Sequence, residues 1–132
     1  MKQSDLVIPA SMKAMYERFH FAPAVRANGM LLCSGQIGAG SDGRPQADPT
    51  EQFGAAFEAV KAVLAEAGLD FTDVVEMTTY HVDLQKHLGA FMAVKDRYVS
   101  APFPAWTAIG ITELALPGGL AEVRVVAKLR NA

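Results

Sequence analysis

Hydrophobic positions along this chain repeat at two spacings, one typical of helices and one typical of strands. After the Gly-, Ser-, Asp- and Pro-rich stretch 38–48, Asp48 and Glu51 form a capping-box pattern around Pro49, which suits a first helical position. Apolar residues then recur every three or four positions as far as Gly68, a common helix stop: Phe53, Phe57, Val60, Leu64 and Ala67. The pattern predicts a helix with one apolar stripe.

The N-terminal part of the chain predicts an irregular arm followed by a hairpin. Residues 1–15 show no sustained period, which is typical of irregular structure. Residues 19–25 and 30–33 are apolar segments on either side of Asn28-Gly29, a strong turn signal. We expect these two segments to pair as antiparallel strands.

The next part predicts a strand and a second helix. Residues 74–82 are dense in β-branched side chains and fit a central strand. Residues 85–99 have a helical pattern, which Pro102 and Pro104 would end.

Two further strands are expected at 106–111 and 120–129, and both alternate between two faces. One face of the last strand is apolar, whereas the other combines Val126 with three charged residues: Glu122, Arg124 and Lys128. We expect Trp106 and Ala108 to lie on this mixed face.

The predicted order is therefore ββαβαββ, an α+β sheet with two helices on one face. Two helices leave the second face uncovered, and its mixed character suits contact with other copies of the chain. The length of 132 residues fits one domain, 1–132.

Composition narrows the range of partners. The chain has 12 Lys and Arg against 14 Asp and Glu and no basic block, so nucleic acid is not an expected partner. No apolar run approaches the ~20 residues of a membrane span, and no signal-peptide pattern opens the chain, which predicts a cytoplasmic protein. Cys33 is the single cysteine, and no Cys/His cluster has metal-site spacing, so no disulfide, metal or cofactor is expected.

Several short motifs carry a family resemblance over residues 20–130. They are Ser34-Gly35-Gln36-Ile37 after a strand, Gln52 early in the first helix, Ala65-Glu66-Ala67-Gly68-Leu69 at its end, Phe103-Pro104-Ala105, and Glu122 with Ala127. In this order and spacing they resemble the RidA family, also called YjgF/YER057c/UK114. The resemblance implies a chorismate-mutase-like fold, a homotrimer, and small-molecule sites in clefts between subunits.

Typical members of that family hydrolyse enamines and imines, notably 2-aminoacrylate, to a keto acid and ammonia without a cofactor. The resemblance implies that an arginine holds the substrate carboxylate, but Trp106 stands at that position here. The family's site tyrosine is Phe21, and an asparagine of its second helix is Lys95. Ser34 is retained, and so is Glu122, which aligns with the glutamate associated with the hydrolytic water.

An indole offers one N–H donor and a large apolar face, which favours neutral, aromatic or cationic ligands over small anions. Trp106 then either lines the cleft or fills it. A replacement cation could come from Arg124, Arg26 or Lys95. For Arg124 itself, the favoured interpretation is an ion-pair or oligomer-contact residue rather than a substitute for the missing arginine.

The remaining candidates each allow two interpretations. Glu122 is a general acid–base group with a raised pKa or a structural ion-pair partner, and Ser34 contacts a ligand or closes a turn. His81 and Asp83, two apart on a strand, are an acid–base pair or a strand end. Cys33 is a buried apolar residue or a reactive thiol.

The leading hypothesis is a homotrimer with a pocket bounded by Phe21, Ser34, Trp106 and Glu122. It would act as a hydrolase or deaminase-like enzyme on a small imine, enamine or related nitrogenous metabolite, with an altered substrate preference because Trp106 replaces the usual arginine. The alternative is a non-catalytic trimer that binds a small metabolite as a sensor or regulator.

Overall fold

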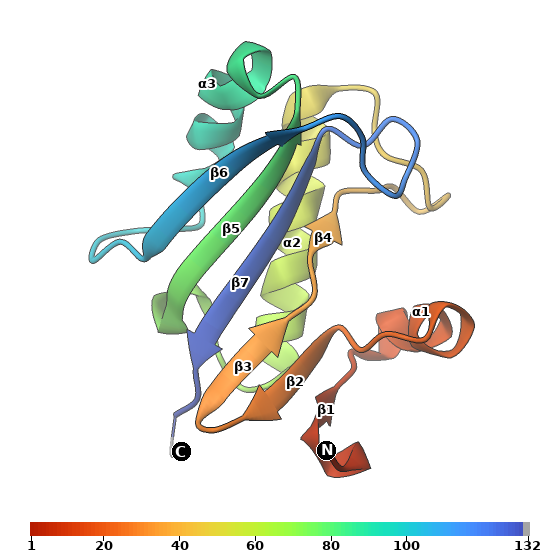
Figure 1. Cartoon of the computed structure of the whole chain (residues 1–132), viewed down its shortest axis with the longest axis vertical. Helices are drawn as coiled ribbons and strands as arrows, with labels where there is room; N and C mark the ends of the chain where they lie inside the picture. Colours follow the sequence, from red (N-terminus) through yellow and green to blue (C-terminus); the bar gives the residue numbers. More distant parts are fainter. Residues whose placement is uncertain (131–132) are drawn as a thin grey trace.

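A single mixed sheet of seven strands runs through the computed structural model, which describes residues 1–130 (Figure 1). The strand order is β1-β2-β3-β7-β5-β6, and the short strand β4 also pairs with β7. The strands are β1 (Leu6–Val7), β2 (Ala24–Ala27), β3 (Met30–Cys33), β4 (Gln36–Ile37), β5 (Val74–Val82), β6 (Ala105–Ile111) and β7 (Ala121–Lys128). The helices are α1 (Lys13–Phe19), α2 (Pro49–Glu66) and α3 (Leu84–Lys95), with short 3₁₀ turns at Gln3–Asp5, Ala10–Met12 and Phe71–Asp73.

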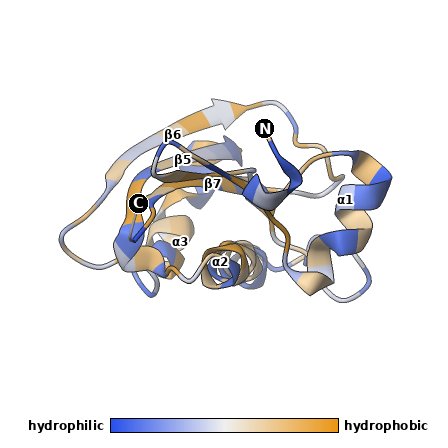
Figure 2. Cartoon of the chain, turned by 90° about the horizontal axis from the view of Figure 1, so that it is seen from below, coloured by the Kyte–Doolittle hydropathy of each residue, from blue (hydrophilic) through white to orange (hydrophobic). Residues whose placement is uncertain are grey.

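Helices α2 and α3 cover one face of the sheet, as the sequence predicts (Figure 2). We call this the helix face and the opposite one the open face. The core lies between the sheet and α2, where Phe53, Phe57, Val60 and Leu64 are at most 1% exposed. The α+β fold class is therefore confirmed. Within residues 1–130, no helix combines the length and apolarity needed to cross a membrane.

The predicted start and end of α2 are present. The Asp48 carboxylate accepts a hydrogen bond from the backbone N–H of Glu51 at 2.9 Å, and Pro49 is the first helical residue. Gly68 follows the helix with a φ of 74°, a conformation that glycine adopts without steric cost.

The hairpin also forms, with a shorter first strand than expected. Asn28 and Gly29 both have positive φ, which is the geometry of a two-residue hairpin turn. The expected strand 19–25 is wrong over residues 19–23, because α1 continues to Phe19 and β2 begins only at Ala24.

Two further expectations differ from the structure. Residues 1–15 are more ordered than an irregular arm, since β1 pairs with β2 and α1 begins at Lys13. The second helix ends at Lys95 rather than Val99. After Lys95 the backbone forms tighter turns, in which the N–H groups of Arg97 and Tyr98 each donate to the carbonyl three residues earlier.

The register of β5 with its neighbours assigns side chains to the two faces. Met77 pairs with Val125 on one side and with Trp106 on the other, so Trp106 lies on the helix face. The expectation that Trp106 and Ala108 share the mixed face is therefore wrong. Glu122, Arg124, Val126 and Lys128 do lie together on the open face, opposite the buried residues of β7.

Gln52 joins α2 to two loops through three hydrogen bonds. Its side-chain amide donates to the carbonyls of Gln46 and Gly118, both at 3.0 Å. Its carbonyl accepts from the backbone N–H of Leu120 at 2.6 Å, and the side chain is 1% exposed. At Gly38 a Cβ atom would lie 1.8 Å from the backbone oxygen of Gln52, so the chain can approach the helix this closely only with glycine.

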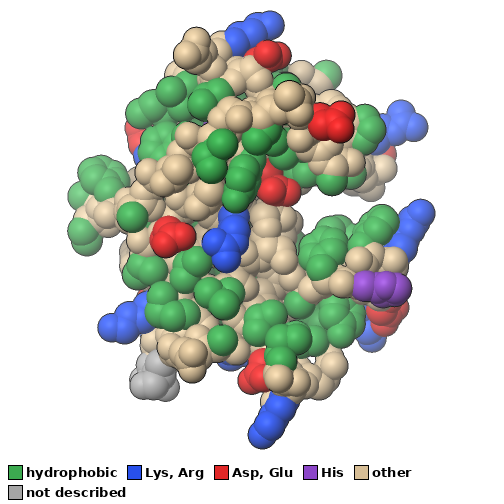
Figure 3. All heavy atoms as spheres, viewed as in Figure 1, with side chains coloured by type: hydrophobic (Ala, Val, Ile, Leu, Met, Phe, Trp, Pro, Cys, Tyr) green, Lys and Arg blue, Asp and Glu red, His purple; other side chains and the backbone are tan. Residues whose placement is uncertain are grey.

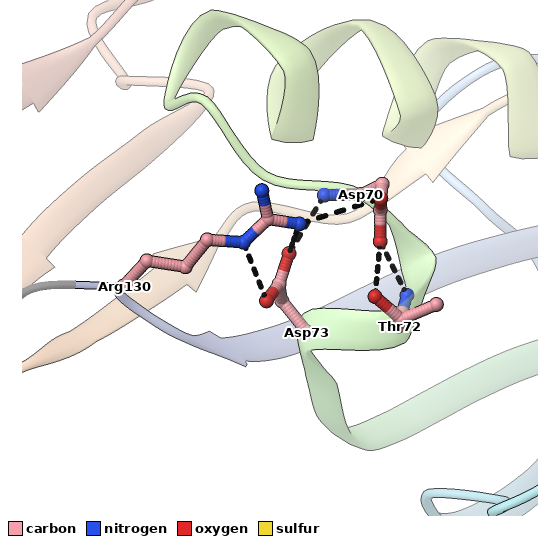
Figure 4. Close-up of polar contacts among 4 residues, drawn as sticks. All are labelled: Asp70, Thr72, Asp73 and Arg130. Atoms are coloured by element: carbon pink, nitrogen blue, oxygen red, sulfur yellow. Dashed lines mark hydrogen bonds and ion pairs between the residues drawn. The ribbon is translucent and has the colours of Figure 1, made fainter.

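The end of the last strand is tied to the start of β5 (Figure 4). Arg130 donates two bonds to the Asp73 carboxylate, at 3.1 and 2.7 Å, and lies 3.3 Å from Asp70. Asp70 also accepts bonds from the backbone and hydroxyl of Thr72. Because the group is exposed, its main effect is to fix the position of the chain end rather than to add much stability.

We expect Gln52→Ala to lower the free energy of unfolding by about 2 kcal/mol, because the partly buried carbonyls of Gln46 and Gly118 and the N–H of Leu120 lose their partner. Urea unfolding followed by circular dichroism measures the change. Gln85→Ala, on the exposed side of α3, is the matched control and should change stability little. Equal stability of the two variants would contradict this role of Gln52.

Candidate functional site

The open face is hollowed between the sheet and the segment that carries α1 (Figure 3). This open-face pocket has a volume of about 550 Å³, within the range of small-molecule sites. Residues from the N-terminal segment, the hairpin and β7 line it: Met1, Leu6, Tyr16, His20, Phe21, Ala22, Val25, Leu32, Cys33, Ser34 and Arg124. Three predicted site residues, Phe21, Ser34 and Arg124, therefore come together.

Among residues 1–130, Arg124 is the only Lys or Arg side chain that lines the pocket. It is half-buried, and none of the ion pairs within residues 1–130 involves it. The expected ion pair with Glu122 is thus not formed in the described part of the chain. An arginine without a carboxylate partner in a partly buried pocket is suited to binding an anion through two parallel hydrogen bonds.

Glu122 lies two residues before Arg124 on the same face of β7, about 6.5–7 Å along the strand. Its side chain lies against Gly35, where a Cβ atom would be 2.5 Å from the carboxyl carbon. Any larger residue at position 35 would therefore displace the carboxylate. Burial raises the pKa of Glu122, which favours a carboxylate that takes up and releases a proton.

Ser34 and Phe21 are held by the same local contact. The Ser34 hydroxyl donates to the carbonyl of Ala22 at 2.7 Å, which fixes the chain beside Phe21. The Ser34 hydroxyl proton therefore already takes part in a hydrogen bond, whereas the hydroxyl oxygen can still accept a hydrogen bond from a ligand. This hydrogen bond supports the interpretation that Ser34 closes a turn. The Ser34 side chain also lines the open-face pocket.

Trp106 is held on the other side of the sheet. Its indole N–H donates to the Thr79 hydroxyl at 2.9 Å, and its ring stacks on Phe91 with centroids 6.2 Å apart. The Lys95 ammonium lies 5.0 Å from the ring centroid and 3.2 Å from a carboxylate oxygen of Asp96. Within one chain, Trp106 is therefore remote from the open-face pocket, and Lys95 serves it as a cation–π partner.

His81 belongs to the same buried cluster and does not pair with Asp83. Its Nε2 is 2.7 Å from the Thr79 hydroxyl, and its Nδ1 is buried without a hydrogen-bond partner. Asp83 is exposed and lies at the start of α3. Burial lowers the pKa of His81 to about 4, so the imidazole is neutral near pH 7.

The remaining candidates do not form a further chemical site. Cys33 is 4% exposed, and burial raises the pKa of its thiol to about 12. Within residues 1–130, no group of three or more His, Cys, Asp or Glu side chains is arranged to hold a metal ion. Arg26 lies in β2 and His20 ends α1, and of these two residues only His20 lines the pocket.

The comparisons with known proteins identify the family and agree with the fold. A family model described as endoribonuclease L-PSP matches residues 11–129. The RutC family protein YjgH of Escherichia coli (strain K12) is 36% identical over 130 residues, which cover 98% of both chains. A structure of protein YJGH has a TM-score of 0.87 at 34% identity, covering 96% of this chain and 97% of that one. RidA from the Antarctic bacterium Psychrobacter sp. PAMC 21119 gives 0.77 at 25% identity, over 83% and 88%.

The chain therefore belongs to the endoribonuclease L-PSP family, the RidA or YjgF/YER057c/UK114 family that its motifs resemble. Sequence reasoning missed the contribution of Leu6 and Tyr16 to the pocket, because neither residue lies in a helix or strand that the sequence predicts. It also missed the contact between Lys95 and Trp106, which joins the end of α3 to β6.

We expect His81 to make the protein less stable in mild acid. In the unfolded chain the imidazole takes up a proton below about pH 6.5, whereas in the folded chain it does so only near pH 4. The stability is thus complete above pH 6.5 and falls as the pH drops towards 4. Between pH 7.5 and 5.0 the loss is up to about 2 kcal/mol, at about 1.4 kcal/mol per pH unit.

Urea unfolding of His81→Gln at the two pH values tests this effect. The variant should lose less stability than the wild type between pH 7.5 and 5.0. His87→Gln retains His81 and should keep the wild-type difference. An unchanged pH dependence in His81→Gln would assign the acid sensitivity to other groups.

We expect Cys33 to react slowly with a water-soluble aromatic disulfide reagent at pH 8, because its thiol is buried and protonated. Unfolding in urea should accelerate the reaction by orders of magnitude. The chain has one cysteine, so the absorbance of the released thiolate reports this residue alone. Equal rates in folded and unfolded protein would restore the reactive-thiol interpretation.

Proposed function

We propose that this protein hydrolyses a small imine or enamine at its open face, with Glu122 as the general acid–base group. The observation that supports this proposal most directly is the partly buried Glu122 carboxylate, with Gly35 leaving it space and Arg124 next to it on the same strand face. Membership of the RidA family supports the reaction class.

The reaction requires few groups. Glu122 removes a proton from water as its oxygen bonds to the imine carbon, and the imine nitrogen gains a proton. The resulting carbinolamine expels ammonia as its hydroxyl loses a proton, which leaves a carbonyl compound. An enamine first gains a proton on carbon to become the imine. A carboxylate with a raised pKa can serve these proton transfers in both directions.

The substrate preference is proposed to differ from that of typical members. Where typical members carry an arginine, this chain carries Trp106. The indole is neutral, and its N–H already donates to the Thr79 hydroxyl, so Trp106 offers no charge to a substrate carboxylate. Arg124 is the cation that we assign to this role. A contribution of Trp106 to the same site requires a second copy of the chain, since in one chain it lies across the sheet from Glu122.

A homotrimer is part of this proposal. The open face of β7 combines charged residues with Val126, and Leu32 and Ile109 on that face are 39% and 40% exposed. A neighbouring subunit would cover such a surface. Ribonuclease activity is not proposed, because a chain with net charge −2 and no basic block lacks grouped phosphate contacts.

We expect Glu122→Gln to lower kcat/KM by about 100-fold or more, the usual contribution of general acid–base catalysis. Gly35→Ala should lower it less, because its Cβ displaces the carboxylate without removing it. Activity should also fall as the pH drops through the raised pKa of Glu122, since the protonated carboxyl cannot accept a proton. Ammonia release from imino acids made in situ measures all three effects.

Gly54→Ala is the matched control, since a Cβ atom there meets nothing within 4 Å. Unchanged turnover in Glu122→Gln would remove this mechanism. Binding of imino acid analogues without any turnover by the wild-type protein would instead favour the non-catalytic metabolite binder.

A further inference from the structure

Tyr80 lies next to Glu122 on the open face of the sheet. Tyr80 of β5 is paired with Glu122 of the antiparallel strand β7. Residues directly opposite each other on such strands have Cβ atoms about 4.5–5.5 Å apart, so their side chains adjoin. Tyr80 stands between Thr79 and His81, which are both 0% exposed on the helix face, and alternation therefore sends its ring to the open face. The register that positions Glu122 thus also positions Tyr80.

Two further residues flank Glu122 on the side away from β5. Gly35 lies so close that a Cβ atom there would be 2.5 Å from the carboxyl carbon, and Ile37 of β4 is paired with Glu122. Gly35 contributes backbone only, and Ile37 contributes an aliphatic side chain. Tyr80 is the aromatic member of the group, with the largest apolar surface. Glu122 is half-buried among these neighbours.

Burial, rather than a charged partner, controls the protonation of Glu122. Arg124 on the same strand and Tyr80 on β5 are the titratable groups beside it on the sheet, and Tyr16 and His20 line the open-face pocket together with Arg124. Desolvation is the cause that raises the pKa of Glu122. The side chains that keep water from the carboxylate therefore decide when it takes up a proton.

We propose that Tyr80 is a positioning residue for Glu122: its ring keeps water from one side of the carboxylate and so sets the pH range over which Glu122 accepts a proton. This inference rests on the proposed function, in which Glu122 is the acid–base group. It adds how that group is regulated, by an aromatic residue on the neighbouring strand rather than by an ion pair.

NMR titration of the Glu122 carboxyl tests this role apart from turnover. The protein carries glutamate labelled at the carboxyl carbon, and the Glu122 signal is the one missing from Glu122→Gln. Tyr80→Thr keeps a β-branched strand residue but removes the ring, so water reaches the carboxylate and its pKa should fall towards the ordinary value. Tyr80→Phe keeps the ring and should titrate like the wild type.

The pH profile of kcat/KM gives a second readout. In Tyr80→Thr the acidic limb should move to lower pH, and the plateau should fall by about threefold to tenfold, because a weaker base is a poorer proton acceptor. Ile109→Thr is the matched control. Ile109 of β6 is paired with Tyr80 on the side away from Glu122, so its removal should leave the titration and the acidic limb unchanged.

Thermal unfolding verifies that each variant is folded. If Tyr80→Thr does not fold, Tyr80→Val replaces it, since the smaller apolar side chain should give a titration between those of the wild type and a ring-free surface. An unchanged Glu122 titration in the folded variant would overturn the proposal. An equal shift in Tyr80→Phe would also overturn it, because the hydroxyl rather than the ring would then matter.

The two proposals fail separately. Turnover that persists in Glu122→Gln, together with a shifted titration in Tyr80→Thr, would overturn only the mechanism. Turnover that is lost in Glu122→Gln, together with an unchanged titration in Tyr80→Thr, would overturn only the role of Tyr80.

Discussion

Strand β7 imposes the constraint on which the rest of the structure depends. It pairs with β3 and β4 on one side and with β5 on the other. Its alternate residues Ala121, Val123, Val125 and Ala127 are at most 1% exposed in the core, while Glu122 and Arg124 point to the open face. A slip of one residue would bury these charges without partners, which is far too costly for a folded domain. The packing of the core therefore fixes the register, and the register fixes the positions of the two charged groups.

Buried polar groups tie the other parts of the fold to this sheet. Gln52 holds the loops that follow β4 and precede β7 against α2, and Thr79 links Trp106 with His81 beneath α3. These hydrogen bonds favour one arrangement of neighbouring elements, because another arrangement would leave more buried donors or acceptors unpaired. The pocket walls thus rest on a scaffold with little freedom to rearrange.

The local elements could be predicted from the sequence because their signals are local. The Asp48 cap, the apolar stripe of α2 and the Asn28-Gly29 turn all depend on residues close together in the chain. The face on which Trp106 lies could not be predicted in this way. Alternation along β6 defines two faces, but only its pairing with Met77 of β5 decides which one meets the helices. The contribution of residues 1–15 was hidden for a similar reason: β1 has two residues and is defined by pairing with β2 rather than by a period.

The candidate site follows the same division. Family motifs indicate Ser34 and Glu122, and strand alternation places Arg124 beside Glu122, but no local pattern indicates that Leu6 and Tyr16 line the pocket. The contact between Lys95 and Trp106 constrains substitution at both positions. Arginine at position 106 would lose the indole bond to Thr79 and place a second positive charge beside the poorly exposed Lys95 ammonium. Positions 95 and 106 are therefore energetically coupled, and a cation at position 106 would favour a neutral side chain at position 95.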